Sequence, residues 1–158
     1  MSLTWRALAG WGALHAVLAV GVGGCRSRTS DARAPGPAMS ADSLELALRS
    51  DKPVYHVGEP IELTLELANR SSGPIDLQFS SSQRYDFEIA DGGGGPMWHW
   101  SADRMFAQVM GTVKLEPGQS QEYRERFLGR LAAGTYRVTG RITAIGATLR
   151  ASATFAVR

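Results

Sequence analysis

The chain has 158 residues, the length of a single domain, of which 44% are hydrophobic and 20% charged. Its single cysteine excludes an internal disulfide and a multi-cysteine zinc site, and its apolar content excludes a disordered chain. The charges are of both signs and sum to +2. Because no basic cluster stands out, we expect no nucleic-acid partner.

The first 24 residues have the pattern of an export signal. One basic residue, Arg6, precedes an uncharged apolar stretch over residues 7–24. Val22-Gly23-Gly24-Cys25 ends this stretch and resembles the lipobox of bacterial lipoproteins, in which the cysteine becomes the lipidated first residue. We therefore predict lipidation of Cys25, a membrane anchor and an extracytoplasmic location in the bacterial cell envelope. An uncleaved membrane anchor and an ordinary signal with an incidental cysteine are the alternatives.

Residues 25–43 continue from this cysteine without apolar periodicity. The stretch is rich in Ser, Ala, Pro and Gly, a composition that cannot bury enough surface to fold. We predict a disordered tether there, followed by one folded domain over residues 44–158.

From residue 44 onward, apolar and polar residues alternate. The alternating runs cover residues 44–49, 61–67, 75–80, 85–89, 122–127, 136–142 and 149–157. Such a period of two gives each strand one buried and one wet face, as in antiparallel sheets. Turn signals separate the runs, and Pro117-Gly118 fits a type II turn. We predict an all-β, immunoglobulin-like antiparallel β-sandwich of roughly eight strands, with Tyr136 as a tyrosine corner.

Several motifs in this domain occur in a recognisable order. They are Gly58-Glu59-Pro60-Ile61, Ser82-Gln83-Arg84-Tyr85-Asp86-Phe87, Trp98-His99-Trp100-Ser101, Pro117-Gly118 and Gly134-Thr135-Tyr136. Together, from about Leu44 to Ala144, they resemble the BsuPI family. The resemblance implies an immunoglobulin-like sandwich that inhibits a subtilisin-like serine proteinase. The namesake of the family is intracellular, whereas the leader of this chain predicts export.

We find no pattern for catalysis and expect no catalytic residue, cofactor or metal. The chain has no nucleophile elbow, phosphate-binding loop or zinc motif. His99 alternates with two tryptophans and is predicted to lie on a surface strand. Asp86 and Glu88 share a strand face that we expect to be wet, and a carbohydrate-active enzyme using this pair is the lower-ranked alternative. The glycines of residues 91–96 predict a flexible hairpin loop rather than a phosphate cradle.

The function that we predict is a monomeric, non-catalytic binding module that presents a loop or an edge strand to a serine protease. The candidate surfaces are residues 80–84, 91–96 and 101–111, and the last of these is irregular with room for a helical turn. The candidate contact residues are Gln83, Arg84, Trp98, Trp100 and Phe106. Trp98 and Trp100 share a face that is either core or a recognition patch. The alternative function is a structural, assembly or adhesion module that binds another envelope protein.

Overall fold

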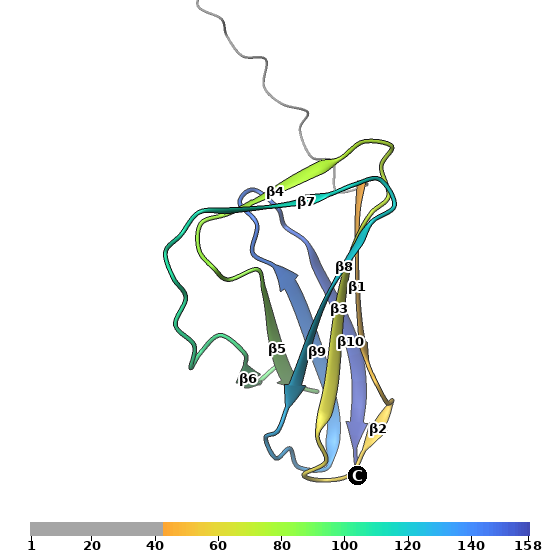
Figure 1. Cartoon of the computed structure of the whole chain (residues 1–158). Helices are drawn as coiled ribbons and strands as arrows, with labels where there is room; N and C mark the ends of the chain where they lie inside the picture. The colour runs from red at the N-terminus through yellow and green to blue at the C-terminus, as the bar shows by residue number, and fades with distance from the viewer. Residues whose placement is uncertain (1–42) are drawn as a thin grey trace, which may run out of the picture. The chain divides into compact units, whose positions relative to one another are not determined.

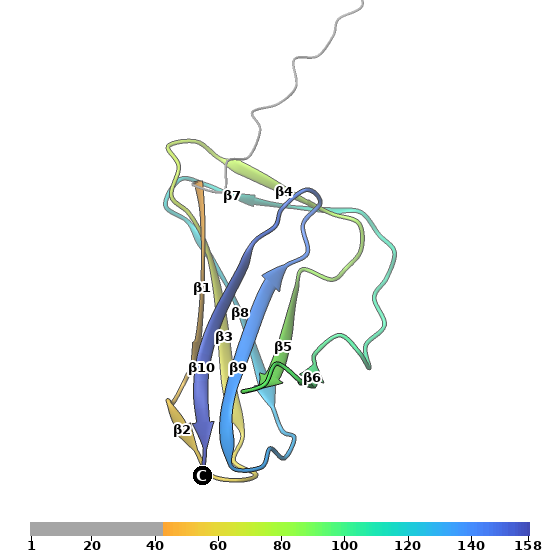
Figure 2. The ribbon, with the colours of Figure 1, turned by 180° about the vertical axis from the view of Figure 1, so that it is seen from behind.

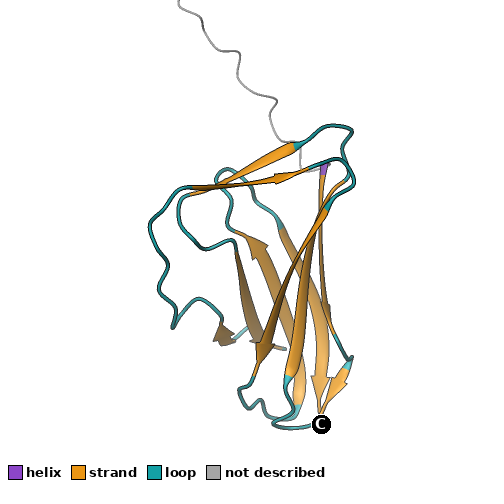
Figure 3. Cartoon of the chain, viewed as in Figure 1, coloured by secondary structure: helices purple, strands orange, loops and turns teal. Residues whose placement is uncertain are grey.

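A computed structural model describes residues 43–158, and this part of the chain folds into ten strands (Figures 1 and 3). The strands are β1 (Leu44–Ser50), β2 (Val54–Tyr55), β3 (Ile61–Asn69), β4 (Ile75–Phe79), β5 (Tyr85–Asp91), β6 (Pro96–His99), β7 (Gly111–Leu115), β8 (Ser120–Phe127), β9 (Gly134–Ile142) and β10 (Arg150–Val157). Within these residues, no helix is long and apolar enough to span a membrane. The predicted signal, Cys25 and the tether up to residue 42 lie outside the described residues.

Two of the sheets form the layers of a sandwich. One has the order β1-β3-β8 and the other the order β2-β10-β9-β5-β6, and they face each other in both views of the ribbon (Figures 1 and 2). A third sheet of two strands, β4-β7, crosses one end of the layers. The prediction of an immunoglobulin-like antiparallel sandwich is confirmed. The predicted number of strands, roughly eight, is lower than the observed ten. Strand β2 has only two residues and pairs in parallel with β10, and β7 lies outside the alternating runs of the sequence.

The core lies between the layers, as the alternation predicts. Strand β3 contributes four side chains that are almost completely inaccessible, namely Ile61, Leu63, Leu65 and Leu67. Phe87, Ile89, Val138 and Phe155 face them from the five-stranded sheet. Burying apolar area of this size is the main favourable contribution to folding in a domain with no cysteine in its described part.

Two predicted local features are present. The Tyr136 hydroxyl donates a hydrogen bond of 2.9 Å to the carbonyl oxygen of Ala132, four residues upstream, which is the geometry of a tyrosine corner. Gly118 has a φ of +75°, and the amide of Gln119 donates to the Glu116 carbonyl at 2.9 Å. The positive φ at the third residue makes residues 116–119 the expected type II turn, where glycine is favoured.

Candidate protein-binding site

A long excursion leaves the sandwich between β6 and β7. Residues 100–110, the β6–β7 loop, arch away from the sheets at one side of the molecule (Figure 1). Three of its apolar side chains are exposed: Met105 completely, Val109 by 63% and Met110 by 65%. One exposed apolar side chain on a surface is ordinary, but three within six residues are typical of a binding segment.

The first half of the loop is fixed to the core through Arg104. A tight turn precedes it, in which the Arg104 amide donates to the Ser101 carbonyl at 3.2 Å. Its Nε donates to the Trp100 carbonyl at 3.1 Å, and its guanidinium lies 4.2 Å from the centre of the Trp100 ring. Its Nη2 is 3.6 Å from Oε2 of Glu125 on β8. Arg104 therefore contacts the domain through its guanidinium, although about half of its side chain, 48%, remains exposed to solvent.

The second half of the loop is fixed by Phe106 and Ala107. The ring of Phe106 packs on Trp100, with the ring centroids 5.7 Å apart. The Ser82 amide donates to the Ala107 carbonyl at 2.8 Å, and the Ala107 amide donates to Ser82 Oγ at 3.0 Å. Met105 is thus an exposed side chain between two neighbours that are both held.

The segment of residues 80–84 supplies this support and is itself attached to the sandwich. The Arg84 guanidinium lies 4.5 Å from the centre of the Phe79 ring and also donates to the Ser81 carbonyl. The Gln83 carbonyl accepts a hydrogen bond of 2.9 Å from Thr143 Oγ1. Two of the three predicted surfaces, residues 80–84 and 101–111, are therefore in direct contact with each other.

The five predicted contact residues have different surroundings. Trp100 is 7% exposed and packs in the core against Tyr85, at 4.6 Å between ring centroids. Its Nε1 is the one buried side-chain nitrogen or oxygen without a hydrogen-bond partner in the described part of the chain. Trp98 is half-buried and packs against Phe127 at 5.1 Å. Gln83, Arg84 and Phe106 are half-buried around the base of the loop. Partner contact by these five stays a prediction.

The five contact residues predicted from the sequence do not include Met105, Val109 and Met110, the exposed large apolar residues of the loop, although the predicted surface 101–111 contains them. They lie in a stretch with neither a period of two nor a period of 3.6, so periodicity assigns them no buried face. The sequence does show three large apolar residues in an irregular segment. Sequence alone, however, does not tell whether such residues are exposed or belong to the core.

A second cluster lies on the outer face of the five-stranded sheet, around Asp86. The expectation of a wet face is wrong at this residue, which is 1% exposed. Asp86 Oδ2 accepts hydrogen bonds from Arg141 Nη2 at 2.6 Å, His99 Nε2 at 2.8 Å and Ser101 Oγ at 3.0 Å. The reason for the burial is that side chains from β9, from β6 and from the start of the loop cover this face of β5.

This cluster contains Ser, His and Asp, but its geometry is not that of a catalytic triad. A triad uses the two ring nitrogens of histidine for two different partners. Here Nε2 of His99 is the atom near both Asp86, at 2.8 Å, and Ser101 Oγ, at 3.4 Å. Ser101 also donates to Asp86 directly. The arrangement neutralises a buried carboxylate and leaves the serine without an aligned base.

The pKa of Asp86 reflects two opposed effects. Burial raises it, while the hydrogen bonds from Arg141, His99 and Ser101 lower it and prevail, so that the pKa lies below its usual value. The carboxylate is therefore ionised at neutral pH. The described residues hold no group of three or more His, Cys, Asp or Glu side chains suited to a metal ion.

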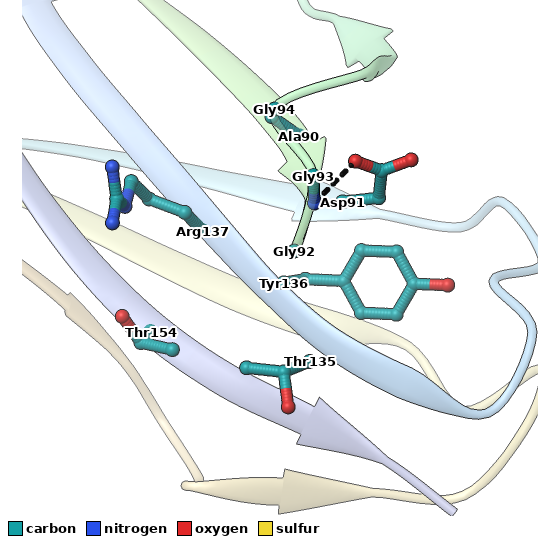
Figure 4. Close-up of a pocket in the computed structure, with 9 residues that line it drawn as sticks. All are labelled: Ala90, Asp91, Gly92, Gly93, Gly94, Thr135, Tyr136, Arg137 and Thr154. Carbon is teal, nitrogen blue, oxygen red and sulfur yellow. Dashed lines mark hydrogen bonds between the residues drawn. The ribbon is translucent and has the colours of Figure 1, made fainter.

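The glycine-rich loop of residues 91–96 lines a third feature, an open hollow of about 360 Å³ (Figure 4). Asp91 Oδ1 accepts hydrogen bonds from the amides of Gly93, at 2.9 Å, and Gly95, at 2.7 Å. The Asp91 carboxylate thus stabilises the hairpin loop that follows it. Tyr136 and Arg137 point to opposite sides of β9 in Figure 4. The lining includes the polar side chains of Asp91, Thr135, Arg137 and Thr154, and the Asp91 carboxylate is already engaged by the amides of its own loop.

Solved structures resemble the backbone of this domain at low sequence identity. They include the alkylpurine DNA glycosylase AlkC of Pseudomonas fluorescens, with a TM-score of 0.44, 19% identity and coverage of 73% of this chain and 30% of that one. The CARDB domain from Pyrococcus furiosus has a TM-score of 0.43, 14% identity and coverage of 72% and 91%. The sporulation control protein Spo0M of Bacillus subtilis has a TM-score of 0.43, 12% identity and coverage of 73% and 48%.

The chain thus spans less than a third of the glycosylase and about half of Spo0M. No curated protein matches the chain at a significant level.

A protein-family model matches residues 48–146, which include all strands from β3 to β9 and the whole β6–β7 loop. Its description is BsuPI, intracellular proteinase inhibitor. This match corrects the predicted extracytoplasmic location, because the family is described as intracellular. The expectation rested on an apolar stretch and four residues around Cys25, a short pattern outside the described residues. Lipidation of Cys25 itself stays a prediction.

Proposed function

This chain belongs to the BsuPI family, and we propose that it binds and inhibits a serine proteinase through the β6–β7 loop. The observation that carries the proposal is the loop itself. Three of its apolar side chains face solvent, while its backbone is held on both sides of Met105. Such a segment offers apolar contact area to a partner and is already ordered before binding.

Order before binding matters because association has a large entropic cost. Each flexible side chain or backbone unit that a complex immobilises costs free energy, and a fixed loop avoids much of that cost. Two hydrogen bonds between Ser82 and Ala107 and the contacts of Arg104 fix this loop to the sandwich. Proteases bind peptide segments in extended form, and an ordered extended loop can occupy the same groove.

The rest of the domain has a supporting role in this proposal. The Asp86 cluster fixes β6 and Ser101, and the loop begins directly after them. The buried Trp100 provides the surface on which Arg104 and Phe106 rest. Protease–inhibitor interfaces bury about 800 Å² per partner, so residues beside the loop on the 80–84 segment would also contribute.

The test is a titration of the full chain into a subtilisin-type proteinase, with residual activity and integrity of the added chain read together. We expect activity to fall linearly to a stoichiometric endpoint while the chain stays intact. Full activity in the presence of excess intact chain would contradict inhibition. Rapid degradation of the chain would also contradict it, because the chain would then be a substrate.

A matched pair of variants assigns inhibition to the loop. Replacing Met105, Val109 and Met110 by serine removes the apolar side chains of the loop, and we expect inhibition to disappear with the melting temperature unchanged. The control replaces three exposed apolar residues elsewhere, Val57, Leu128 and Ile145, by serine. Equal loss of inhibition in both variants would show that the loop is not the contact.

A further inference from the structure

On the premise that the chain inhibits a proteinase, we infer that Met105 occupies the primary specificity pocket of that enzyme and that this pocket is apolar. Met105 is fully exposed, whereas its two neighbours are engaged with the domain. A protease accepts one side chain of its substrate in this pocket, and the pocket largely sets its specificity. Of residues 104–106, Met105 is the fully exposed one, whereas Arg104 is about half exposed and held by its contacts and Phe106 is half-buried.

Arg104 is the obvious competitor, because a basic side chain beside Met105 would suit a protease with an acidic pocket. Its guanidinium, however, lies on the Trp100 ring, its Nε donates to the Trp100 carbonyl, and its Nη2 lies near Glu125. Entering a pocket would require all three contacts to break. An acidic pocket is therefore disfavoured, and an apolar one fits the long unbranched side chain of Met105.

Phe106 and Ala107 fix the chain on the other side of the bond that would face the catalytic serine. Phe106 packs on Trp100, and Ala107 exchanges two hydrogen bonds with Ser82. Hydrolysis would break the bond between the Met105 carbonyl carbon and the Phe106 nitrogen, with the hydroxyl of water going to the carbon and its remaining hydrogen to the nitrogen. Both new ends would remain attached to the domain, so we expect any cut there to be slow and the complex to persist.

The decisive variants change the charge of one side chain. We expect Met105→Asp to weaken inhibition of a subtilisin-type proteinase by about 1,000-fold or more, since a carboxylate cannot be buried unpaired in an apolar pocket. Leu128→Asp places the same charge on an exposed apolar residue outside the loop, and we expect it to weaken inhibition by less than about 10-fold. The two variants should melt at the temperature of the unmodified chain, because both side chains face solvent.

A gain of function completes the test. Met105→Lys should convert the chain into a stoichiometric inhibitor of trypsin, whose pocket is acidic and which the unmodified chain should not inhibit. Mass spectrometry after prolonged incubation with the subtilisin-type proteinase should find the first cut between Met105 and Phe106.

The outcomes separate the role of Met105 from inhibition itself. If the unmodified chain inhibits and Met105→Asp inhibits equally well, or if Leu128→Asp weakens inhibition as much as Met105→Asp, Met105 is not the specificity residue, although the chain remains an inhibitor. A first cut elsewhere, or trypsin inhibition by the unmodified chain, would also exclude Met105. If the unmodified chain inhibits neither proteinase, inhibition fails, and the assignment of Met105 fails with it.

Discussion

Asp86 connects more parts of the molecule than any other polar residue at the site. Its carboxylate accepts hydrogen bonds from Arg141 on β9, from His99 on β6 and from Ser101 at the start of the β6–β7 loop. Its other oxygen accepts a 3.0 Å bond from the Phe87 amide. Hydrogen bonds to a charged group contribute more than neutral ones, at about 1.5–3 kcal/mol each when a partner is removed. One carboxylate therefore fixes the strand from which the loop departs.

The depressed pKa of Asp86 makes this contribution depend on pH. A carboxyl group whose pKa is lower in the folded than in the unfolded state stabilises the fold above the unfolded value, about 3.9. That stabilisation is lost as the pH falls below 4 and through the folded pKa. At neutral pH it is fully present.

We expect Asp86→Asn to lower the free energy of unfolding by about 2 kcal/mol at pH 7, because an amide accepts weaker hydrogen bonds from Arg141 and His99. As the pH falls below 4 and through the lowered folded pKa, the difference from the unmodified chain should shrink, since Asp86 is progressively protonated. The matched control is Glu88→Gln on the same strand, where the side chain is exposed. Denaturant unfolding at pH 7 and pH 3 measures both. Equal stability of the two variants at pH 7 would show that the cluster contributes nothing.

At the scale of the element, the β6–β7 loop is an irregular segment whose order comes from two other parts of the chain. Trp100 supports Arg104 and Phe106, and Ser82 supports Ala107. The loop has eleven residues, of which three expose large apolar side chains. Without these contacts to Trp100 and Ser82, nothing would hold it in one conformation. The 80–84 segment is thus as much a part of the site as the loop.

Ser82→Ala tests this support. The change removes the side-chain acceptor of the Ala107 amide but keeps the backbone bond from Ser82 to the Ala107 carbonyl. We expect the Ala107 amide to exchange its hydrogen about tenfold faster, the effect of losing one hydrogen bond worth about 1.4 kcal/mol. Ser80→Ala, an exposed serine in the same segment, should leave this rate unchanged. An unchanged rate in Ser82→Ala would mean that the bond does not order the loop.

The alternation of apolar and polar residues predicted the strands correctly, whereas the irregular sequence of the β6–β7 loop did not predict its contacts. The runs containing Leu63, Phe87 and Val138 became buried strands because a period of two fixes which side chains share a face. The turn at Gly118 followed from the conformation that glycine permits. The loop contacts did not follow, because Ser82 and Ala107 are 25 residues apart. Such a contact depends on the folded arrangement and has no local sequence signal.

At the scale of the whole molecule, strand order is the information that the sequence pattern did not contain. The alternation of side chains along the strand correctly placed Asp86 on the outer face of β5. It did not show that β9 and β6 would flank that strand. Arg141 and His99 come from these two neighbours and bury the carboxylate. A wet face predicted for one strand thus became a buried charge in the assembled sheet.

The two layers of the sandwich approach closely at Gly140, in the middle of the five-stranded sheet. It pairs with Phe87 of β5 and Ala151 of β10, and a Cβ placed on it would lie 2.7 Å from Cδ1 of Leu65 on β3. Leu65 is completely buried within the core. A side chain at residue 140 would therefore push the layers apart.

We expect Gly140→Val to destabilise the fold by about 1–3 kcal/mol, the usual cost of overpacking a core, and to lower the melting temperature by several degrees. Gly73→Ala is the control, because a Cβ there meets no atom within 4 Å, and its effect should stay within about 0.5 kcal/mol. Thermal unfolding of the full chain checks both. Because the β6–β7 loop rests on β5, β6 and β8, a Gly140→Val variant that is still folded should also inhibit less tightly. A variant with unchanged stability would show that the layers have room at this point, contrary to the close packing of Gly140 on Leu65.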